Sequence, residues 1–476
     1  MGVGFGFKVQ GEKSTTWRVY GGKPLNGEVP IAGYKHAMTL LLPACIMTSS
    51  KAVLSNVPDM FETRVFLKML VDLGAKISFN GHTLKIDADN VKSAEVPANL
   101  SRLIHGSVNL VPAMLARFGE VTFGGSGGDQ IGDSSMDGVR PMSHILSILE
   151  RFGASFTETE HGLRGMCRKL EGQTIDINDY AQNKETGSGP LVSGATKTAV
   201  MAAASAEGIS IIKNPRNKET VADLLTFLKN CGCKIKLKED EWEIEGGIKS
   251  SHVEQVLTPD MSEVISFIAA ATYLESPLTL TNMTGEVIKP ALTPELDVLD
   301  RMGVEVHFQG EIAYVIPPSE VRATDVITTN SGIGIKPDSQ PFFALMLTVA
   351  DGPSTVTDNV WENRFNYVDE LNRQGADIRR DGKVVHITPR APYRAKTVVK
   401  TPDTRAGAVA VLAALGIDGP TIITDTYHIA RGYEKFDTKL QSIGAQIEVY
   451  QEVDPNSYGI ELPQKHEVNR ATALRV

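Results

Sequence analysis

Basic and acidic side chains that could bind an anion and move a proton gather at several points of this 476-residue chain. In three segments an arginine stands close to a carboxylate where a strand is expected to run into a helix. The segments are Glu362-Asn-Arg364-Phe365, Asp403-Thr-Arg405-Ala406 and Arg431-Gly-Tyr-Glu434. An arginine at such a place can clamp a phosphate or a carboxylate with two parallel hydrogen bonds. One such arginine is more simply structural, but three at equivalent places favour a site for an anionic ligand.

Three further features are weaker alone. Lys35 follows Gly33 at the entry of an expected helix, where free N–H groups and an ammonium suit an anion, although a surface lysine is the simpler interpretation. The glycine-rich segment 124–132 resembles a phosphate loop but lacks the Gly-Lys-Ser/Thr ending, so it is a surface loop or a lid. Asp338 stands at the start of another helix, where its simplest role is an N-cap.

Composition narrows the class of protein. The net charge of −9 argues against nucleic-acid binding, and no apolar run is long enough to span a membrane. The first 17 residues have no apolar core of a secretory signal, and four cysteines make no disulfide scaffold, so the cytoplasm is the expected compartment. No metal-binding spacing is present: Cys231 and Cys233 are interpreted as buried thiols.

A repeat of about 70–80 residues organises the elements that must position these groups. Each copy ends in a helical stretch, a glycine, a small residue and an alternating strand. The glycine is expected to form the left-handed C-cap between helix and strand. The six glycines are Gly74, Gly153, Gly232, Gly303, Gly375 and Gly444.

Each copy also contains an earlier, Ala-rich helix that is apolar nearly all round and is therefore expected to be buried. These helices are predicted at 37–47, 106–117, 198–207, 266–274, 340–349 and 406–415. The sequence thus predicts an α/β protein of six βαβαββ-type units. Because no polar end unit is visible, a solenoid is disfavoured, and two domains of three units are expected. The predicted division is 35–258 for units 1–3, and 1–34 plus 259–476 for units 4–6.

Taken together in this order, the segments resemble the enolpyruvyl transferases, over about 19–449. Glu362-Asn-Arg-Phe, Tyr427-His-Ile-x-Arg431-Gly-Tyr-Glu, Asp403-x-Arg405 and Gly33-x-Lys35 carry the resemblance. It is nearer to the members that act on UDP-N-acetylglucosamine than to those that act on shikimate 3-phosphate. The resemblance implies a two-domain inside-out α/β barrel and transfer of the enolpyruvyl group of phosphoenolpyruvate to a hydroxyl, with phosphate release. It implies no metal and no organic cofactor.

The resemblance also implies roles for residues. Lys35, Arg140 and Arg431 would hold phosphoenolpyruvate, and Asp338 would take the proton from the acceptor hydroxyl, with burial beside a substrate raising its pKa. Asp403 and Arg405 would line the reaction centre. The full predicted set is Asp338, Asp129, Asp403, Arg405 and Lys35 for catalysis, and Lys35, His36, His105, Arg140, Arg364, Arg431 and Glu219 for substrate binding.

The chain departs from the family pattern mainly on the acceptor side. His36 replaces an asparagine, His105 an arginine, and Pro190 and Val192 a lysine and a serine. Asp129 is nearest to the position of the reactive cysteine. A carboxyl can transfer a proton, but it lacks the thiolate that fosfomycin alkylates, so insensitivity to that drug is expected.

Three hypotheses follow from these departures. The acceptor is the 3-hydroxyl of UDP-N-acetylglucosamine, as in peptidoglycan synthesis, or the 3′-hydroxyl of UMP, as in nucleoside-antibiotic synthesis. In either case the partners are phosphoenolpyruvate and a uridine nucleotide. The third hypothesis is a non-catalytic binding protein of the same fold. Retention of Lys35, Asp338 and Arg405 argues against the third, since buried charges without a use are costly.

Overall fold

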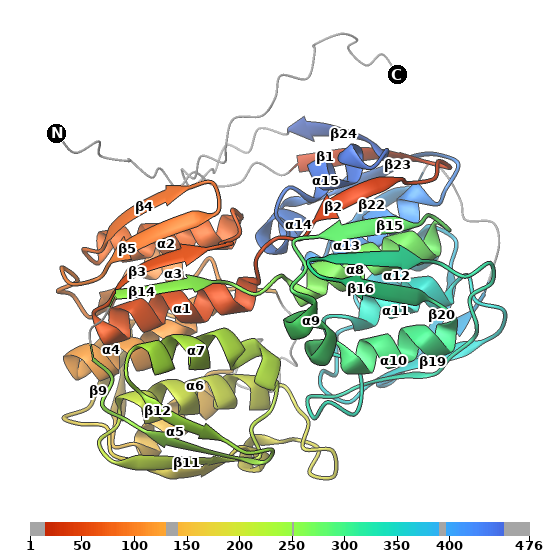
Figure 1. Cartoon of the computed structure of the whole chain (residues 1–476). Helices are drawn as coiled ribbons and strands as arrows, with labels where there is room; N and C mark the ends of the chain where they lie inside the picture. The colour runs from red at the N-terminus through yellow and green to blue at the C-terminus, as the bar shows by residue number, and fades with distance from the viewer. Residues whose placement is uncertain (1–14, 130–140, 250–251, 390–396, 452–476) are drawn as a thin grey trace.

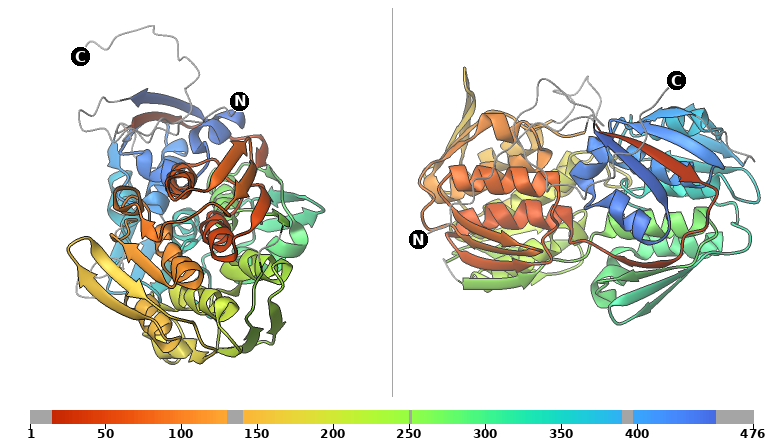
Figure 2. Two further views of the ribbon diagram at one scale, coloured as in Figure 1. Left: turned by 90° about the vertical axis from the view of Figure 1, so that its left-hand side faces the viewer. Right: turned by 90° about the horizontal axis from the view of Figure 1, so that it is seen from above.

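Two halves of similar construction face each other in the computed structural model of the chain (Figure 1). The structure describes residues 15–129, 141–249, 252–389 and 397–451. Each half contains three units, and the views from the side and from above show helices on the inside and sheets on the outside (Figure 2). The architecture confirms the two-domain α/β fold predicted from the repeat.

Six four-stranded sheets share one plan within the described residues. In every sheet one pair of neighbouring strands at an edge is parallel, and the other two pairs are antiparallel. The sheets of the half we call N-terminal contain β3 (Lys51–Ser55), β4 (Lys76–Asn80), β5 (Thr83–Asp87) and β14 (His252–Val256); β6 (Glu95–Val96), β7 (Glu120–Phe123), β8 (Ser155–Thr159) and β9 (Gly162–Met166); and β10 (Thr174–Asp176), β11 (Ile209–Lys213), β12 (Lys234–Leu237) and β13 (Glu241–Glu245).

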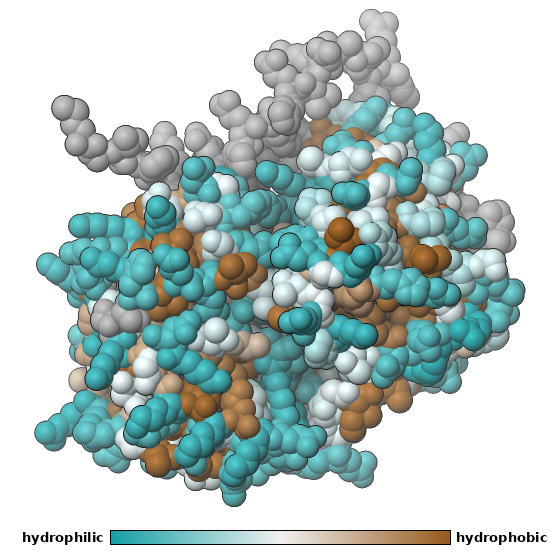
Figure 3. All heavy atoms as spheres, in the orientation of Figure 1, coloured by the Kyte–Doolittle hydropathy of each residue, from teal (hydrophilic) through white to brown (hydrophobic). Residues whose placement is uncertain are grey.

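The half we call C-terminal repeats the same plan. Its sheets contain β2 (Gly27–Pro30), β15 (Leu278–Thr281), β16 (Glu305–Gln309) and β17 (Ile312–Ile316); β18 (Val326–Thr328), β19 (Ser354–Asp358), β20 (Asp377–Asp381) and β21 (Val384–Thr388); and β1 (Thr15–Gly21), β22 (Val398–Lys400), β23 (Gly419–Thr424) and β24 (Gln446–Gln451). Alternate residues of β19 are buried, as the period of a strand with one face on a core requires. On the face drawn in Figure 3, apolar residues form scattered groups among hydrophilic ones.

One nearly apolar helix per unit fills the interior of each half. The six are α1 (Lys35–Thr48), α4 (Leu110–Phe118), α6 (Val192–Ser205), α8 (Met261–Tyr273), α11 (Gln340–Leu347) and α13 (Thr404–Leu415). All 13 residues of α8 are buried, which confirms the prediction that these helices are covered on all sides. The helix expected at 106–117 is shorter, because its first turn is the 3-10 helix η1 (His105–Asn109).

The second helix of each unit ends at the predicted glycine. These helices are α2 (Phe61–Asp72), α5 (Ser143–Arg151), α7 (Ala222–Asn230), α10 (Thr293–Met302), α12 (Tyr367–Arg373) and α15 (Phe436–Ser442). All six glycines have φ between 87° and 110°, a range that side chains strongly disfavour. The expected left-handed caps are therefore confirmed. Shorter helical segments complete the chain: α3 (Ala98–Ser101), η2 (Ile177–Tyr180), η3 (Lys218–Val221), α9 (Gly285–Ala291) and α14 (Tyr427–Gly432).

The chain crosses between the halves at two adjacent points. Strands β1 and β2 belong to sheets of the C-terminal half, whereas β14 pairs with β3 in the N-terminal half (Figure 1). The crossing segments bond each other: Tyr34 N donates to Thr258 O at 2.8 Å, and Asp260 N donates to Ala32 O at 2.8 Å. The boundaries predicted after residues 34 and 258 fall here, and as exact boundaries they stay a prediction.

Gly33 has a packing reason at the first crossing. A Cβ at this position would lie 1.6 Å from the carbonyl oxygen of Asn56, so only glycine allows the two backbones to approach. Lys35, two residues later, is thereby held at the N-terminus of α1 and between the halves.

The cap glycines allow a paired test of backbone strain. We expect Gly232→Ala to cost about 1–2 kcal/mol, because φ is +87° but no atom lies within 4 Å of the new Cβ. Gly74→Ala should cost more, since its Cβ would also lie 2.7 Å from the Asn90 carbonyl oxygen. Urea unfolding midpoints of the two variants would measure this order, and equal shifts would contradict it.

Candidate active site

A cleft of about 220 Å³ lies between the two halves. We call it the central cleft. Its charged and titratable lining comes from both halves: Lys35, His36, Glu62, His105, Asp129, His144 and Lys197 on one side, and Lys336, Asp338, Arg364, Arg405 and Arg431 on the other. The structure thus brings together ionisable groups that are up to about 400 residues apart in the chain.

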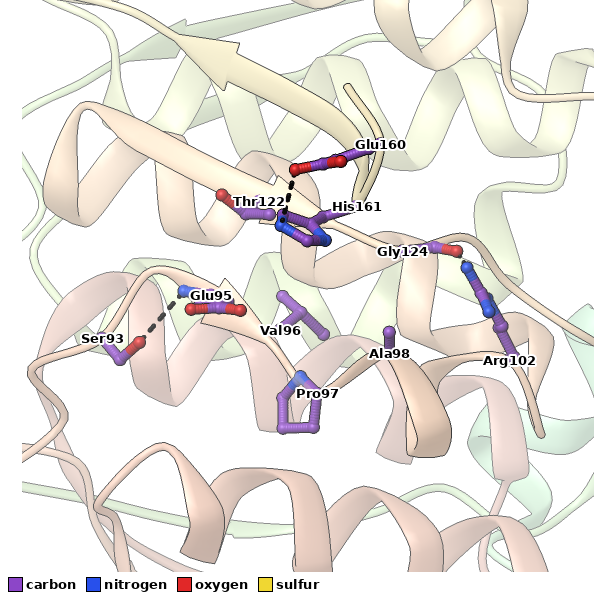
Figure 4. A pocket seen from close by; sticks show the side chains of 10 residues that line it. All are labelled: Ser93, Glu95, Val96, Pro97, Ala98, Arg102, Thr122, Gly124, Glu160 and His161. Atoms are coloured by element: carbon purple, nitrogen blue, oxygen red, sulfur yellow. Dashed lines mark hydrogen bonds and ion pairs between the residues drawn. The ribbon is translucent and has the colours of Figure 1, made fainter. Parts of the chain in front are cut away.

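A second cavity, of about 520 Å³, opens beside the sheet that contains β7 (Figure 4). Its polar groups bond near neighbours. The Arg102 guanidinium donates to the Gly124 carbonyl at 2.7 Å, Ser93 Oγ accepts from Glu95 N at 3.1 Å, and His161 lies 3.5 Å from Glu160. This second cavity lacks the cluster of cations that lines the central cleft. We therefore take the central cleft as the candidate active site.

Glu62 joins two cations of the central cleft. One oxygen of this buried carboxylate on α2 lies 3.6 Å from Lys35 Nζ and 3.5 Å from a guanidinium nitrogen of Arg431. Since α2 belongs to one half and α14 to the other, this pair of contacts helps to hold the halves together. Glu62 thus places the two cations next to each other at the cleft, where an anionic ligand can compete for them.

Asp338 is held by two arginines. Arg364 donates to one of its oxygens and Arg405 to the other, the latter at 3.1 Å. Asp338 does not cap α11, so the simpler N-cap interpretation is wrong for it. Arg405 also stacks on the ring of Tyr433, 4.9 Å from its centre, which fixes the guanidinium plane.

In the free protein the pKa of Asp338 is lowered, and the rise expected beside a bound substrate stays a prediction. Burial alone would raise this pKa, but the charges of Arg364 and Arg405 outweigh the loss of hydration and hold it well below its ordinary value. In the free protein Asp338 is therefore an ionised carboxylate and a weak base.

Asp403 performs the capping that the sequence suggested for Asp338. Its Oδ1 accepts hydrogen bonds from Arg405 N and Ala406 N at the start of α13, and its Oδ2 accepts from Asn366. Asp403 is not among the residues that line the central cleft, unlike its neighbours Thr404 and Arg405. Asp403 therefore fixes the N-terminal end of α13, which carries Arg405.

Asp129 reaches across the cleft to the C-terminal half. Its oxygens accept hydrogen bonds from Thr404 Oγ1 and an Arg431 guanidinium nitrogen, both at 2.9 Å, and His428 Nδ1 lies 3.8 Å away. Burial would raise the pKa of Asp129, but His428, Arg431 and Lys35 outweigh it and lower the pKa strongly. The Asp129 carboxylate therefore lies among the cations of the central cleft.

Histidines line the side of the cleft formed by the N-terminal half. His36 is the second residue of α1, and burial together with the charge of Lys197 holds its pKa well below the ordinary value, so the ring is neutral. His105 begins η1 beside Gly128. His144, on α5, had no assigned role in the sequence, yet it also lines the cleft.

The remaining predicted residues are less directly placed. Glu219, on η3, is not among the lining residues, but its carboxylate lies 4.0 Å from Lys336 Nζ. Pro190 lines the cleft, whereas Val192 is fully buried in α6. Arg140 lies outside the described residues.

Glu62, Lys197 and Lys336 were missed by the sequence analysis. Lys336 contacts Glu295 at 3.3 Å and the Ala291 carbonyl, and it lies two residues before Asp338. Lys197 carried a usable signal, because it is the one cation in the Ala-rich stretch 192–205. The sequence carried no such signal for Glu62, because an acidic residue in the first turn of a helix is ordinarily explained by the helix dipole.

The chain belongs to the EPSP synthase (3-phosphoshikimate 1-carboxyvinyltransferase) family, whose model matches residues 19–440. It is an enolpyruvyl (carboxyvinyl) transferase. Among its relatives are UDP-N-acetylglucosamine 1-carboxyvinyltransferase 1 of Symbiobacterium thermophilum, 33% identical over 90% of this chain and 94% of the relative, and the enzyme of the same name from Kosmotoga olearia, 33% identical over 91% and 99%.

Solved structures agree with this family. The enolpyruvyl transferase NikO from Streptomyces tendae superimposes with a TM-score of 0.86 and 31% identity, over 93% of this chain and all of NikO. EPSP synthase from Acinetobacter baumannii, at 18% identity and a TM-score of 0.67, shares the fold over 92% of this chain and all of that one. Within the described residues, no helix is long and apolar enough to cross a membrane, and no cluster of side chains suits a metal ion.

His144 should make the protein sensitive to acid. Burial lowers the pKa of this histidine to about 4, so between about pH 4 and 6.5 the unfolded chain binds a proton that the folded chain does not. His144 therefore has almost no effect on the free energy of unfolding at pH 7.5, but it lowers that free energy by about 2 kcal/mol at pH 5. We expect His144→Leu to gain that amount relative to the wild type between these two pH values, measured by urea unfolding.

The matched control is His252→Leu, because His252 is exposed on β14. It should follow the wild type at both pH values. An equal loss of stability in His144→Leu and the wild type would contradict the prediction.

Proposed function

We propose that the central cleft transfers the enolpyruvyl group of phosphoenolpyruvate to a secondary hydroxyl of a uridine nucleotide, most simply the 3-hydroxyl of UDP-N-acetylglucosamine. The observation that carries the proposal is the clamp of Asp338 between Arg364 and Arg405, which lies with Arg431 on one side of the cleft and faces Lys35 on the other. It offers cations for a carboxylate and a phosphate, and a carboxylate for the incoming hydroxyl. The relatives named as carboxyvinyltransferases of UDP-N-acetylglucosamine support the same substrate.

The proposed steps balance as follows. Asp338 accepts the proton of the acceptor hydroxyl while that oxygen bonds to the central carbon of phosphoenolpyruvate, and the methylene carbon gains a proton from Asp129. The C–O bond to phosphate in the tetrahedral adduct then breaks. Asp129, now a carboxylate, takes a proton back from the methyl carbon, which restores the double bond, and Asp338 passes its proton to the leaving phosphate. Lys35, Arg405 and Arg431 stabilise the negative charge of the phosphate throughout.

Substrate binding would also adjust the two carboxylates. An anionic ligand competes for the guanidinium groups that hold Asp338 and Asp129, and its own charge disfavours their ionised forms. Both pKa values therefore rise when phosphoenolpyruvate binds. Asp129 can then carry a proton to deliver, and Asp338 becomes a better base.

The 3′-hydroxyl of UMP is the second candidate acceptor. The specific observation in its favour is the changed wall of the cleft, where neutral His36 and cationic Lys197 lie close together and Pro190 stands nearby. An unmatched polar contact discriminates strongly between acceptors. The similarity to NikO is compatible with either acceptor. Because phosphoenolpyruvate and nucleotides are cytoplasmic metabolites, we propose the cytoplasm as the site of action.

Phosphate release tests the proposal directly. Purified protein is incubated with phosphoenolpyruvate and either UDP-N-acetylglucosamine or UMP, and inorganic phosphate is measured. We expect release that depends on one of the two nucleotides, and Asp338→Asn should lower kcat by about 100-fold or more, because it removes the base. Asp297→Asn, on the exposed face of α10, is the matched control. Binding of phosphoenolpyruvate without release would favour the non-catalytic alternative.

Insensitivity to fosfomycin is a separate expectation. The four cysteines of the chain are all buried and unbridged, and burial raises the pKa of the Cys233 thiol to about 11. No reactive thiolate therefore faces the drug in the central cleft. We expect the wild type to keep its activity after incubation with fosfomycin and Asp129→Cys to lose it with time. Rapid irreversible inactivation of the wild type would contradict this.

A further inference from the structure

Glu295 is a fully buried carboxylate that the proposed steps do not use. It lies in the first turn of α10, its side chain has no exposed surface, and it is not among the residues that line the central cleft. Within the described residues, the three hydrogen-bond donors that reach it all come from one short segment of the same half. That segment runs from Lys336 to Ser339 and has Asp338 inside it.

One oxygen of Glu295 holds both sides of Asp338. Its Oε1 accepts from Lys336 N at 2.7 Å and from Ser339 Oγ at 3.0 Å. Its Oε2 lies 3.3 Å from Lys336 Nζ, which also donates to the Ala291 carbonyl. Ser339 N in turn donates to Lys336 O at 3.0 Å, which closes the segment into a turn. Glu295 therefore fixes the backbone immediately before and after Asp338.

The Ser339 hydroxyl shows what this contact does to the start of α11. Ser339 stands directly before the helix, where a serine ordinarily accepts a hydrogen bond from a free backbone N–H group. No side chain caps α11 in this way, since the Ser339 hydroxyl donates to Glu295 and the Asp338 carboxylate accepts from two arginines. The turn is thus held in a conformation in which Asp338 lines the cleft and does not bond the helix end.

Glu295 holds the turn from a side that a substrate does not reach. The Asp338 carboxylate is held by Arg364 and Arg405, which line the cleft and for which an anionic ligand competes. Glu295 lies outside the lining, so its bonds to the turn persist when the arginines bind a ligand. A base has to stay within hydrogen-bond reach of its proton, and a misplacement of about 1 Å costs about 100-fold in rate.

We propose that Glu295 is a positioning residue. It keeps Asp338 where it accepts the proton of the acceptor hydroxyl, while the substrates occupy the arginines that hold Asp338 in the free protein. The inference rests on the proposed function in one respect, that Asp338 is the base. Glu295 acts through the turn and not by contact with a substrate.

Three variants test this by phosphate release with the nucleotide that supports it. We expect Glu295→Leu to lower kcat about 10- to 100-fold and to leave the dissociation constant of phosphoenolpyruvate within about threefold of the wild type. Glu295→Gln keeps an oxygen acceptor for Lys336 N and Ser339 Oγ, and it should restore kcat to within about threefold. Ser339→Ala removes one bond and should lower kcat about three- to tenfold, which keeps the test open if Glu295→Leu does not fold.

Combination with Asp338→Asn separates positioning from a structural role. If Glu295 acts through Asp338, adding Glu295→Leu or Ser339→Ala to Asp338→Asn should lower kcat by less than about twofold. A structural role would repeat the full loss in both backgrounds. Glu370→Leu is the matched control, because Glu370 is a buried glutamate of the same half that accepts from Lys400 N at 3.0 Å, away from the turn. Any loss of kcat that it causes should be equal with and without Asp338→Asn.

Crystal structures of Glu295→Leu and Ser339→Ala keep the outcome separable from that of the proposed function. We expect the turn to change its conformation in both variants and Asp338 to leave at least one of its two arginines in the first. An unchanged turn, equal losses of kcat in the two backgrounds, or a Glu295→Gln variant as slow as Glu295→Leu would each overturn the inference.

The two proposals can fail independently. Phosphate release by the wild type, with an unchanged kcat in Glu295→Leu, would keep the proposed function and lose this inference. No release by the wild type, with an altered turn in the variants, would lose the proposed function and leave the hold of Glu295 on Asp338 in place.

Discussion

Pairing of buried arginines with carboxylates, within the C-terminal half and between the two halves, is the interaction on which the rest of the site depends. Arg405 and Arg364 share Asp338, while Arg431 binds both Glu62 and Asp129. A buried guanidinium without a counter-charge would be costly, so these cations can be gathered only where carboxylates meet them. The same pairing lowers the pKa values of Asp338 and Asp129, and an anionic substrate must enter this network rather than fill an empty space.

The network depends in turn on where the core helices begin. Asp260 caps α8 through Ser262 N and Glu263 N, and its other oxygen accepts from Lys35 N at the start of α1. One carboxylate therefore ties together the first turns of helices from opposite halves. Asp403 does the same for α13 within its own half. Helix N-termini that converge in this way add their own positive ends to a site for anions.

The two ends of the central cleft differ in chemistry. The end near Asp338 is dense in charge and resembles what any enolpyruvyl transferase needs. The end near His144 is neutral and largely apolar, with Lys197 between the two. Under the proposed function, charge binds the donor substrate, whereas single hydrogen bonds with strict geometry distinguish one acceptor from another. Differences among members of the family are therefore expected at the end of the cleft near His144.

The sequence determined those features that are local. Six glycine caps and six buried helices were predicted because a cap needs a left-handed residue and a covered helix needs apolar residues all round, and both signals lie within a few turns. The arginines Arg364, Arg405 and Arg431 were singled out for the same reason, as residues at repeated strand-to-helix turns. The resemblance carried by these segments then indicated the family.

Only the tertiary structure decided which group each of them meets. Asp338 and Asp403 look alike in the sequence, yet one is clamped by arginines and the other caps a helix, because backbone geometry at the helix start determines which oxygen faces the free N–H groups. Glu62 meets Arg431 369 positions later in the chain. The low pKa of Asp338 and the unpaired ring of His144 arise from neighbours that the fold supplies, and no local pattern encodes them.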